Sequence, residues 1–299
     1  MAKALANKWI ILVILALTWG SVFILIKKAL LVFNPFEIGA LRMGISGIAL
    51  LYFGIPAIRK MDKRTFLWVS TVGLVGNFVP AFLFPIAQTQ VSSSMAGILD
   101  SLVPVFVLVL GFIFFGIRSQ FTQFIGAFVG FAGAAFLMWL SESHTEETQV
   151  GYAMLVVLAT ALYALSALII KTKLAHVPSL ELSSSAITIW MLPSFAALYF
   201  AGFYTNFEAT PETWEALGYL SILAILGTAI CGFLYFKLIQ DVSPVFASTV
   251  TYFLPVVAVI WGLIDGEQFT FWYLIGGLLI LIGIYLIREK KKKPEHIPR

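Results

Sequence analysis

The chain repeats itself at a spacing of about 151 residues. Gly76-Asn77 recurs as Gly227-Thr228 and Pro104-Val105 as Pro255-Val256. The same spacing links Phe82-Leu83 with Phe233-Leu234, Val91-Ser92 with Val242-Ser243, Ala96 with Ala247, and Gly111 with Gly262. Each copy holds an odd number of apolar segments, so the second copy must cross a membrane in the opposite sense to the first. Inverted repeats of this kind are typical of secondary transporters, and the pattern therefore predicts solute transport.

Composition supports a membrane protein. Hydrophobic residues make up 60% of the chain and charged residues 11%, which leaves too few polar groups to cover a soluble globule. The first apolar stretch has no small-residue cleavage site, and we expect it to be a spanning helix that stays attached. The single cysteine, Cys231, lies in an apolar segment, and no cysteine and histidine spacing suggests a metal site. We expect no metal and no cofactor.

Ten apolar runs are each long enough to cross about 30 Å of hydrocarbon. They cover residues 8–30, 36–55, 66–88, 92–115, 120–140, 150–171, 180–203, 215–237, 243–264 and 270–287. The predicted fold is an all-α membrane protein with ten transmembrane helices, arranged as two inverted five-helix repeats around a central cavity. We expect the first repeat at 1–144, the second at 145–288, and a basic cytoplasmic tail at 289–299.

Lysine and arginine predict the orientation, because short loops rich in these residues stay on the cytoplasmic side. The residues that share this side are Lys3, Lys8, Arg59, Lys60, Lys63, Arg64, Arg118, Lys171, Lys173, Lys237 and the cluster from Arg288 to Lys293. Both termini should then be cytoplasmic, in a bacterial-type inner membrane. Lys27 and Lys28 are exceptions, explained by ancestry, because Lys27 and Lys171 hold the same repeat position. The tail is expected to anchor the chain at the membrane surface, with lipid regulation as the alternative.

Two sets of motifs resemble the EamA-type proteins of the drug/metabolite transporter superfamily. The first is Leu17-Thr18-Trp19-Gly20-Ser21, followed by Lys27 and Leu41-Arg42; the second is Pro104-Val105-Phe106 with Gly116 and Gly126, echoed by Pro255-Val256-Val257 with Gly266-Glu267 and Gly276. The resemblance covers nearly the whole chain. It implies two inverted five-helix repeats around a central cavity, with alternating access and often export of small metabolites.

The chain departs from that family in two places. The glutamate that usually follows the glycine is present as Glu267 but is replaced by Ile117 in the first copy. The four-helix multidrug exporters of the superfamily carry a proton-binding glutamate that would fall near Trp19 or Tyr163, and this chain has no carboxylate there. The multidrug antiport mechanism is therefore disfavoured.

Two charges lie deep within predicted helices. An ionised side chain is costly in hydrocarbon, so such a residue usually faces the protein interior. At about 1.5 Å per residue, Arg42 lies about 10 Å past Pro35 and Asp100 about 12 Å past Ser92, which places them at one depth. We expect the two to interact directly or through water or substrate. Asp100 is the candidate for ion coupling or for a substrate ammonium and Arg42 for a substrate carboxylate; a structural ion pair is the alternative.

Asn77 and Thr228 occupy matching positions halfway along helices that glycine or proline interrupts. Paired interruptions of this kind can line a cavity near the bilayer midplane. Close helix packing and hydrogen bonds between helices are the alternative. The expected helix breaks or hinges are Pro80, Pro85, Pro104 and Pro255.

Aromatic residues lie well inside several helices, away from the interfacial belts. They are predicted to line the path and to stack on a substrate or hold a cation, although ordinary packing explains such rings too. The full set of predicted cavity residues is Trp19, Arg42, Asn77, Phe78, Phe82, Asp100, Tyr163, Trp190, Thr228, Tyr235, Thr251 and Tyr252. The serine runs at 92–94 and 183–185 are better explained by capping and bonds between helices.

The absence of certain sequence motifs narrows the class of membrane protein. The chain has no GxxxxGK loop for ATP and no intramembrane nucleophile arrangement, so we expect neither a pump nor an enzyme. The expected partners are a small metabolite, membrane lipid and a possible coupling proton, without nucleic acid. A small neutral or zwitterionic metabolite such as an amino acid, moved outward, is the leading substrate, because phosphorylated solutes usually require several fixed cations. A lipid or hydrophobic-drug exporter and a non-transporting scaffold stay open as alternatives.

Overall fold

A computed structural model of the chain describes residues 2–91, 93–117, 120–141, 150–254, 256–257 and 271–287. Secondary structure in these ranges is helical, without a strand. The first half contains α1 (Ala2–Gly20), α2 (Val22–Ala29), α3 (Pro35–Lys60), α4 (Lys63–Gly73), η1 (Leu74–Phe78), α5 (Val79–Ala87), α6 (Ser93–Asp100), α7 (Val103–Phe115) and α8 (Phe121–Ser141). The second contains α9 (Val150–Lys173), α10 (Ser179–Phe200), α11 (Phe203–Asn206), α12 (Pro211–Ile222), η2 (Leu223–Ile230), α13 (Cys231–Asp241), α14 (Pro244–Ser248), η3 (Thr249–Phe253) and α16 (Phe271–Ile287).

Six helical runs are long and apolar enough to cross a membrane. They are Lys8–Ala29, Pro35–Lys60, Lys63–Ala87, Val150–Lys173, Ser179–Phe200 and Pro211–Asp241, with the shorter apolar helices Val103–Phe115, Phe121–Gly133 and Ile275–Ile287 beside them. The chain is therefore a multi-pass membrane protein. The six runs coincide with six of the ten expected spans, while the complete ten-helix inverted arrangement stays a prediction.

Two of the long runs are interrupted at matching positions by π-helices. The π-helix η1 contains Gly76 and Asn77, and η2 contains Gly227 and Thr228. In a π-helix each N–H bonds to the carbonyl five residues back instead of four, so a carbonyl at the transition loses its usual partner. The repeated Gly-polar pairs thus lie where the backbone is open to side chains from other helices.

A second kind of interruption follows α6. This helix ends at Asp100, and α7 begins at Val103 with Pro104 in its first turn. The matching stretch of the second half is a 3₁₀ helix, η3, which includes Thr251. Of the other expected breaks, Pro80 lies in the first turn of α5, directly after η1, and Pro85 lies within α5. Pro255 and the basic tail lie outside the described residues.

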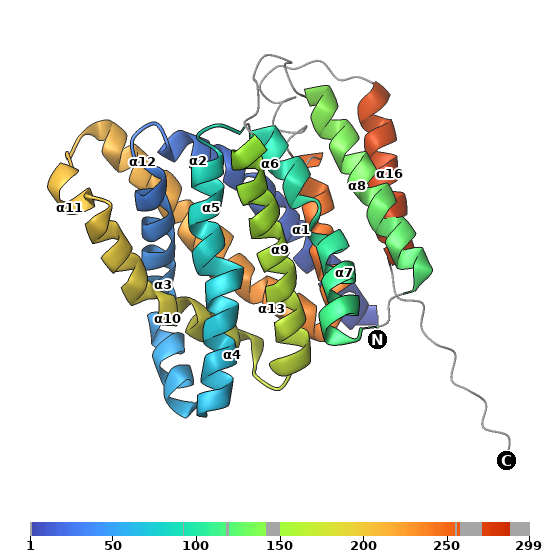
Figure 1. Ribbon diagram of the computed structural model, residues 1–299, viewed down its shortest axis with the longest axis horizontal. Helices are drawn as coiled ribbons and strands as arrows, with labels where there is room; N and C mark the ends of the chain where they lie inside the picture. Colours follow the sequence, from blue (N-terminus) through green and yellow to red (C-terminus); the bar gives the residue numbers. More distant parts are fainter. Residues whose placement is uncertain are drawn as a thin grey trace, which may run out of the picture.

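Glycines bring helices from the two halves into close contact. A Cβ atom on Gly47 of α3 would lie 2.6 Å from Cβ of Met191 in α10. In α8 and α16, a Cβ on Gly126 would lie 2.7 Å from the carbonyl oxygen of Gly283. These two helices run beside each other at one edge of the bundle (Figure 1). Small residues are the usual means of close approach between membrane helices.

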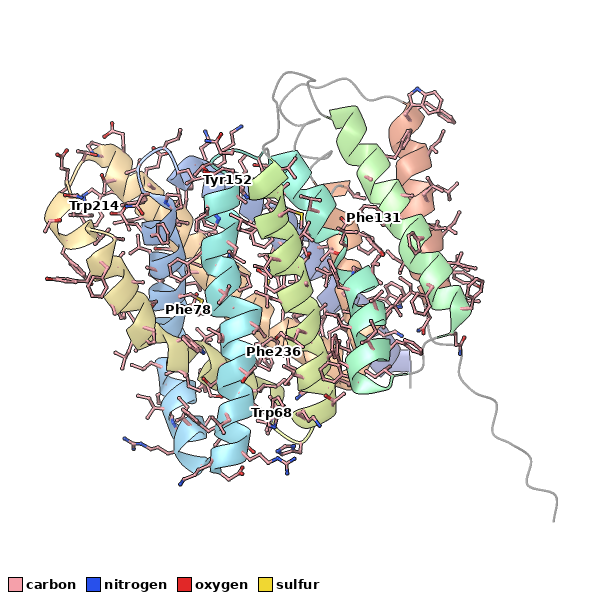
Figure 2. All side chains as sticks on the ribbon, viewed as in Figure 1. Trp68, Phe78, Phe131, Tyr152, Trp214 and Phe236 are labelled. Atoms are coloured by element: carbon pink, nitrogen blue, oxygen red, sulfur yellow. The ribbon has the colours of Figure 1, made fainter. Side chains whose placement is uncertain are left out.

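Aromatic residues occur both at the ends and in the middle of the bundle. Tyr152 and Trp214 lie toward one end and Trp68 toward the other, whereas Phe78 and Phe236 lie between them (Figure 2). Tyrosine and tryptophan at the two ends suit a membrane interface. Of the two rings between the ends, Phe236 lines the cavity described next.

Candidate functional site

A cavity in the middle of the bundle gathers most of the predicted site residues. Its interior offers about 90 Å³ to the centres of water molecules, enough for several of them. Eight predicted residues line it: Trp19, Arg42, Asn77, Asp100, Tyr163, Thr228, Tyr235 and Thr251. Arg42 and Asp100 are the only charged side chains among the described lining residues.

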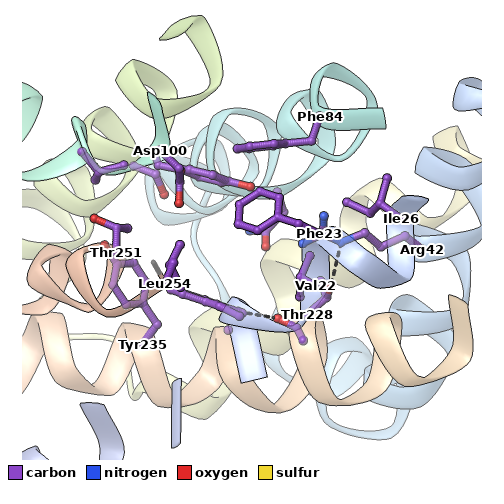
Figure 3. Close-up of a pocket in the computed structure, with 18 of the residues that line it drawn as sticks. Val22, Phe23, Ile26, Arg42, Phe84, Asp100, Thr228, Tyr235, Thr251 and Leu254 are labelled. Carbon is purple, nitrogen blue, oxygen red and sulfur yellow. Dashed lines mark hydrogen bonds between the residues drawn. The ribbon is translucent and has the colours of Figure 1, made fainter. Parts of the chain in front are cut away.

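Arg42 is held by the second π-helix. Its Nε donates a hydrogen bond of 2.8 Å to Oγ1 of Thr228, which itself donates to the carbonyl of Leu223 at 3.3 Å. Figure 3 shows this bond at one side of the cavity. The bond uses Nε, so the terminal guanidinium nitrogens are not engaged by Thr228. Arg42 therefore combines a fixed position with donor capacity for an anion.

Two further side chains from the first half donate to η2. Nε1 of Trp19 donates to the carbonyl of Gly227 at 2.8 Å. Oγ of Ser46 lies 2.9 Å from the carbonyl of Ala224 and 2.6 Å from that of Arg42. Ser46 is fully buried. The irregular backbone of η2 is thus tied to α1 and α3 on the side that carries Arg42.

Asp100 is buried, and one of its carboxylate oxygens has no partner. Its side chain is 7% exposed, and its Oδ1 has no hydrogen-bond partner. The expected direct pair with Arg42 is not formed, because Arg42 is bound to Thr228 on the other side of the cavity (Figure 3). Among the described residues the ion pair within 4.0 Å is Lys237 with Asp241. An interaction of Arg42 with Asp100 through water or substrate stays a prediction.

Two tyrosines line the cavity together with Asp100. Tyr163 interacts with the charges of both Arg42 and Asp100. Tyr235 interacts with Asp100 and with Tyr163, and its ring meets that of Trp19 edge to face at 5.1 Å. The Tyr163 ring is stacked near Phe84 at 6.0 Å. The carboxylate therefore faces a cavity with phenolic oxygens and aromatic rings.

Four predicted residues do not line this cavity. Phe78 packs against Phe82 at 5.0 Å and Trp190 at 4.8 Å, and these three form a separate aromatic group. Nε1 of Trp190 donates to the carbonyl of Ser70. Tyr252 is fully buried and donates to the carbonyl of Ala127 at 2.7 Å. These contacts suit packing between helices.

Several lining residues were not predicted. Phe23, Ile26, Phe84, Ser166 and Phe236 all face the cavity. Phe23 and Ile26 follow Trp19 at four and seven residues, and Ser166 follows Tyr163 at three. Helical spacing from the predicted positions would have found these three.

Comparison with known proteins shows similarity to one protein family. The model of the EamA-like transporter family matches the chain twice, over residues 7–139 and 151–288. An "Uncharacterized transporter" of Archaeoglobus fulgidus is 25% identical over 289 residues, which cover 95% of this chain and 100% of that protein. The "Uncharacterized inner membrane transporter YedA" of Escherichia coli K12 is 27% identical over 290 residues, covering 92% of this chain and 91% of its own length.

A solved crystal structure also resembles the chain. It has a TM-score of 0.72 at 17% sequence identity and covers 94% of this chain and 96% of its own. At that identity the likeness concerns the fold alone.

Proposed function

The chain belongs to the EamA-like transporter family, and we propose that it is a secondary active transporter that exports a small zwitterionic or neutral metabolite such as an amino acid. The observation that carries this proposal is the central cavity, which presents a fixed guanidinium on one side and, on the other, a carboxylate whose Oδ1 has no hydrogen-bond partner. A zwitterion would supply an opposite charge to each.

The charge of the cavity favours this class of substrate over phosphorylated solutes. Arg42 is the one basic side chain among the described lining residues, and Asp100 balances it. A phosphate monoester carries close to two negative charges near pH 7, and it would find one cation and an opposing carboxylate. A carboxylate suits the donors of a single guanidinium. The aromatic walls would favour an apolar or aromatic side chain on the substrate.

Alternating access would follow from an inverted repeat. The proposed architecture has ten helices in two inverted five-helix units, with both termini in the cytoplasm. The matching π-helices and the close contacts of α3 with α10 and of α8 with α16 support it. Rocking of one unit against the other would open the cavity to each side in turn.

Ligand-dependent melting of the purified protein tests the proposal. A ligand that binds the folded state alone raises the melting temperature by mass action. We expect neutral amino acids to raise it and phosphorylated metabolites or amphiphilic drugs to have no effect. The Asp100→Asn variant should then export less in proteoliposomes and respond less to an ion gradient.

Each other outcome of the melting experiment would favour one of the alternative functions. Stabilisation by amphiphiles would favour a lipid or drug exporter, and stabilisation by phosphorylated compounds would overturn the substrate class. For water access, cysteine is placed at Asn77 or Thr228 in a Cys231→Ser background. Labelling by a membrane-impermeant thiol reagent supports a hydrated path, whereas full protection of both positions favours a scaffold.

A further inference from the structure

Two interrupted helices meet at Asp100. The first is the break between α6 and α7, and the second is η3, which holds Thr251 at the matching repeat position. Oγ of Ser101 bridges them, at 3.0 Å from the carbonyl of Gly97 and 3.3 Å from that of Thr251. Breaks of this kind expose backbone oxygens, and the C-terminal end of a helix such as α6 favours positive charge.

The carboxylate at this crossing has no compensating charge. The Asp100 side chain is only 7% exposed, and its Oδ1 has no hydrogen-bond partner. Arg42 is bound to Thr228 across the cavity. A buried carboxylate at membrane depth requires a counter-charge or a proton. A bound proton or a small cation would therefore satisfy this position.

Hydroxyl oxygens of other residues share the cavity with the carboxylate. The Thr251 hydroxyl donates its proton to the carbonyl of Ser248 at 3.0 Å, which leaves its lone pairs free to accept. Thr251 and Asp100 lie together at the same side of the cavity (Figure 3). Tyr163 and Tyr235 line the same cavity and add two phenolic hydroxyls to it. Hard cations prefer oxygen ligands of these kinds.

We propose that Asp100 and Thr251 bind a sodium ion at the crossing of the α6–α7 break with η3. This inference rests on the proposed transport function and deepens it by naming the coupling ion. A sodium ion and the ammonium group of a substrate would occupy the Asp100 carboxylate in turn. Mutual exclusion at one carboxylate couples inward movement of sodium to outward movement of the substrate, without a second binding site.

The Thr251 hydroxyl distinguishes binding of a sodium ion from binding of a proton. A proton needs the carboxylate alone, whereas a sodium ion also needs the neutral oxygens around it. Thr251→Val keeps the shape of the side chain and the carboxylate but removes one oxygen. Thr249→Val is the matched control, because Thr249 is a fully buried residue of the same η3 whose hydroxyl also donates three residues back, to Phe246 at 2.7 Å, but it does not line the cavity.

The experiment measures the melting temperature of the purified full-length protein in NaCl, KCl or choline chloride at equal ionic strength. We expect saturating NaCl to raise it by about 2 °C or more over choline chloride. Thr249→Val should keep this rise, whereas Thr251→Val should lose at least half of it and Asp100→Asn all of it. NaCl should also weaken the response to an amino-acid ligand in a competitive manner.

Failure of the sodium site is distinguishable from failure of the transport proposal. No rise in NaCl, an equal rise in KCl, or an unchanged rise in Thr251→Val overturns the site, even where amino acids still stabilise the protein. A rise specific to sodium that depends on Thr251 supports the site, even where every metabolite fails to bind. If Asp100→Asn does not fold, Thr251→Val and its control still decide.

Discussion

The two π-helices, η1 and η2, occupy matching positions in the two halves but are held differently. Trp19, Arg42 and Ser46 of the first half donate hydrogen bonds to Gly227, Thr228 and Ala224 of η2. In η1, by contrast, Nδ2 of Asn77 is buried without a partner, and Gly76 is pressed against another helix. The two matching π-helices therefore differ in their contacts. Side chains of α1 and α3 hold η2 in place, whereas η1 presents an unsatisfied donor at the cavity.

The largest expected effect is on ligand binding by Arg42→Ala. This variant leaves the Thr228 hydroxyl without its charged donor and removes the only guanidinium of the described cavity lining. A hydrogen bond to a charged group contributes about 1.5–3 kcal/mol, so we expect ligand affinity to fall by about tenfold to a hundredfold. Isothermal titration calorimetry with the amino acid that stabilises the protein most measures this affinity. Arg59→Ala, an exposed position at the end of the same helix, is the control. Near-normal affinity in Arg42→Ala would show that η2 holds this side chain for structural reasons only.

Gly76→Ala should destabilise the protein next most strongly. The added Cβ would lie 2.2 Å from Oγ and 2.8 Å from Cβ of Ser166, so α9 must move away from η1. Overpacking of this kind costs about 1–3 kcal/mol. The matched change is Gly227→Ala, whose Cβ would meet nothing nearer than 3.3 Å. Thermal melting compares them, and Ser166→Gly should rescue Gly76→Ala. Equal losses in both alanine variants would contradict the asymmetry.

Thr228→Val should lower the stability of the protein, whereas Asn77→Leu should not. Valine removes the acceptor of Arg42 and leaves a half-buried cation with fewer bonds, which should cost about 1–2 kcal/mol. Leucine replaces an amide that has no partner on Nδ2, so it should leave the melting temperature unchanged or raise it. Melting curves and ligand titration are measured on both variants. A lower melting temperature in Asn77→Leu, without ligand present, would reveal a structural role for that amide.

The smallest effects are expected for two tryptophans. Trp19→Phe and Trp190→Phe each lose one hydrogen bond to a backbone carbonyl, of Gly227 and Ser70 respectively. Each should cost about 1 kcal/mol of stability. Only Trp19 lines the cavity, so only Trp19→Phe should also weaken ligand binding. A comparable loss of affinity in Trp190→Phe would extend the site to the aromatic group of Phe78.

The sequence indicates positions more reliably than partners. Helical rise predicted one depth for Arg42 and Asp100, and both line the same cavity. The Gly-polar pairs marked the helices that are interrupted. Their contacts did not follow, because the bond of Arg42 to Thr228 joins residues 186 apart and depends on how α3 packs on η2. The same limit explains Trp190 and Tyr252, whose aromatic character suits a cavity and a packed interface equally well. Residues at helical spacing from Trp19 and Tyr163 also line the cavity, so helical periodicity would have predicted more of the lining than the single positions did.

The glycine contacts between α8 and α16 have a mechanical consequence. Where a Cβ on Gly283 would lie 2.5 Å from the backbone nitrogen of Gly130, the two main chains touch without side chains between them. Side chains can change rotamer to absorb sliding, but two backbones in contact cannot. We therefore expect α8 and α16 to stay together, so that rocking of the two units would pivot about this contact.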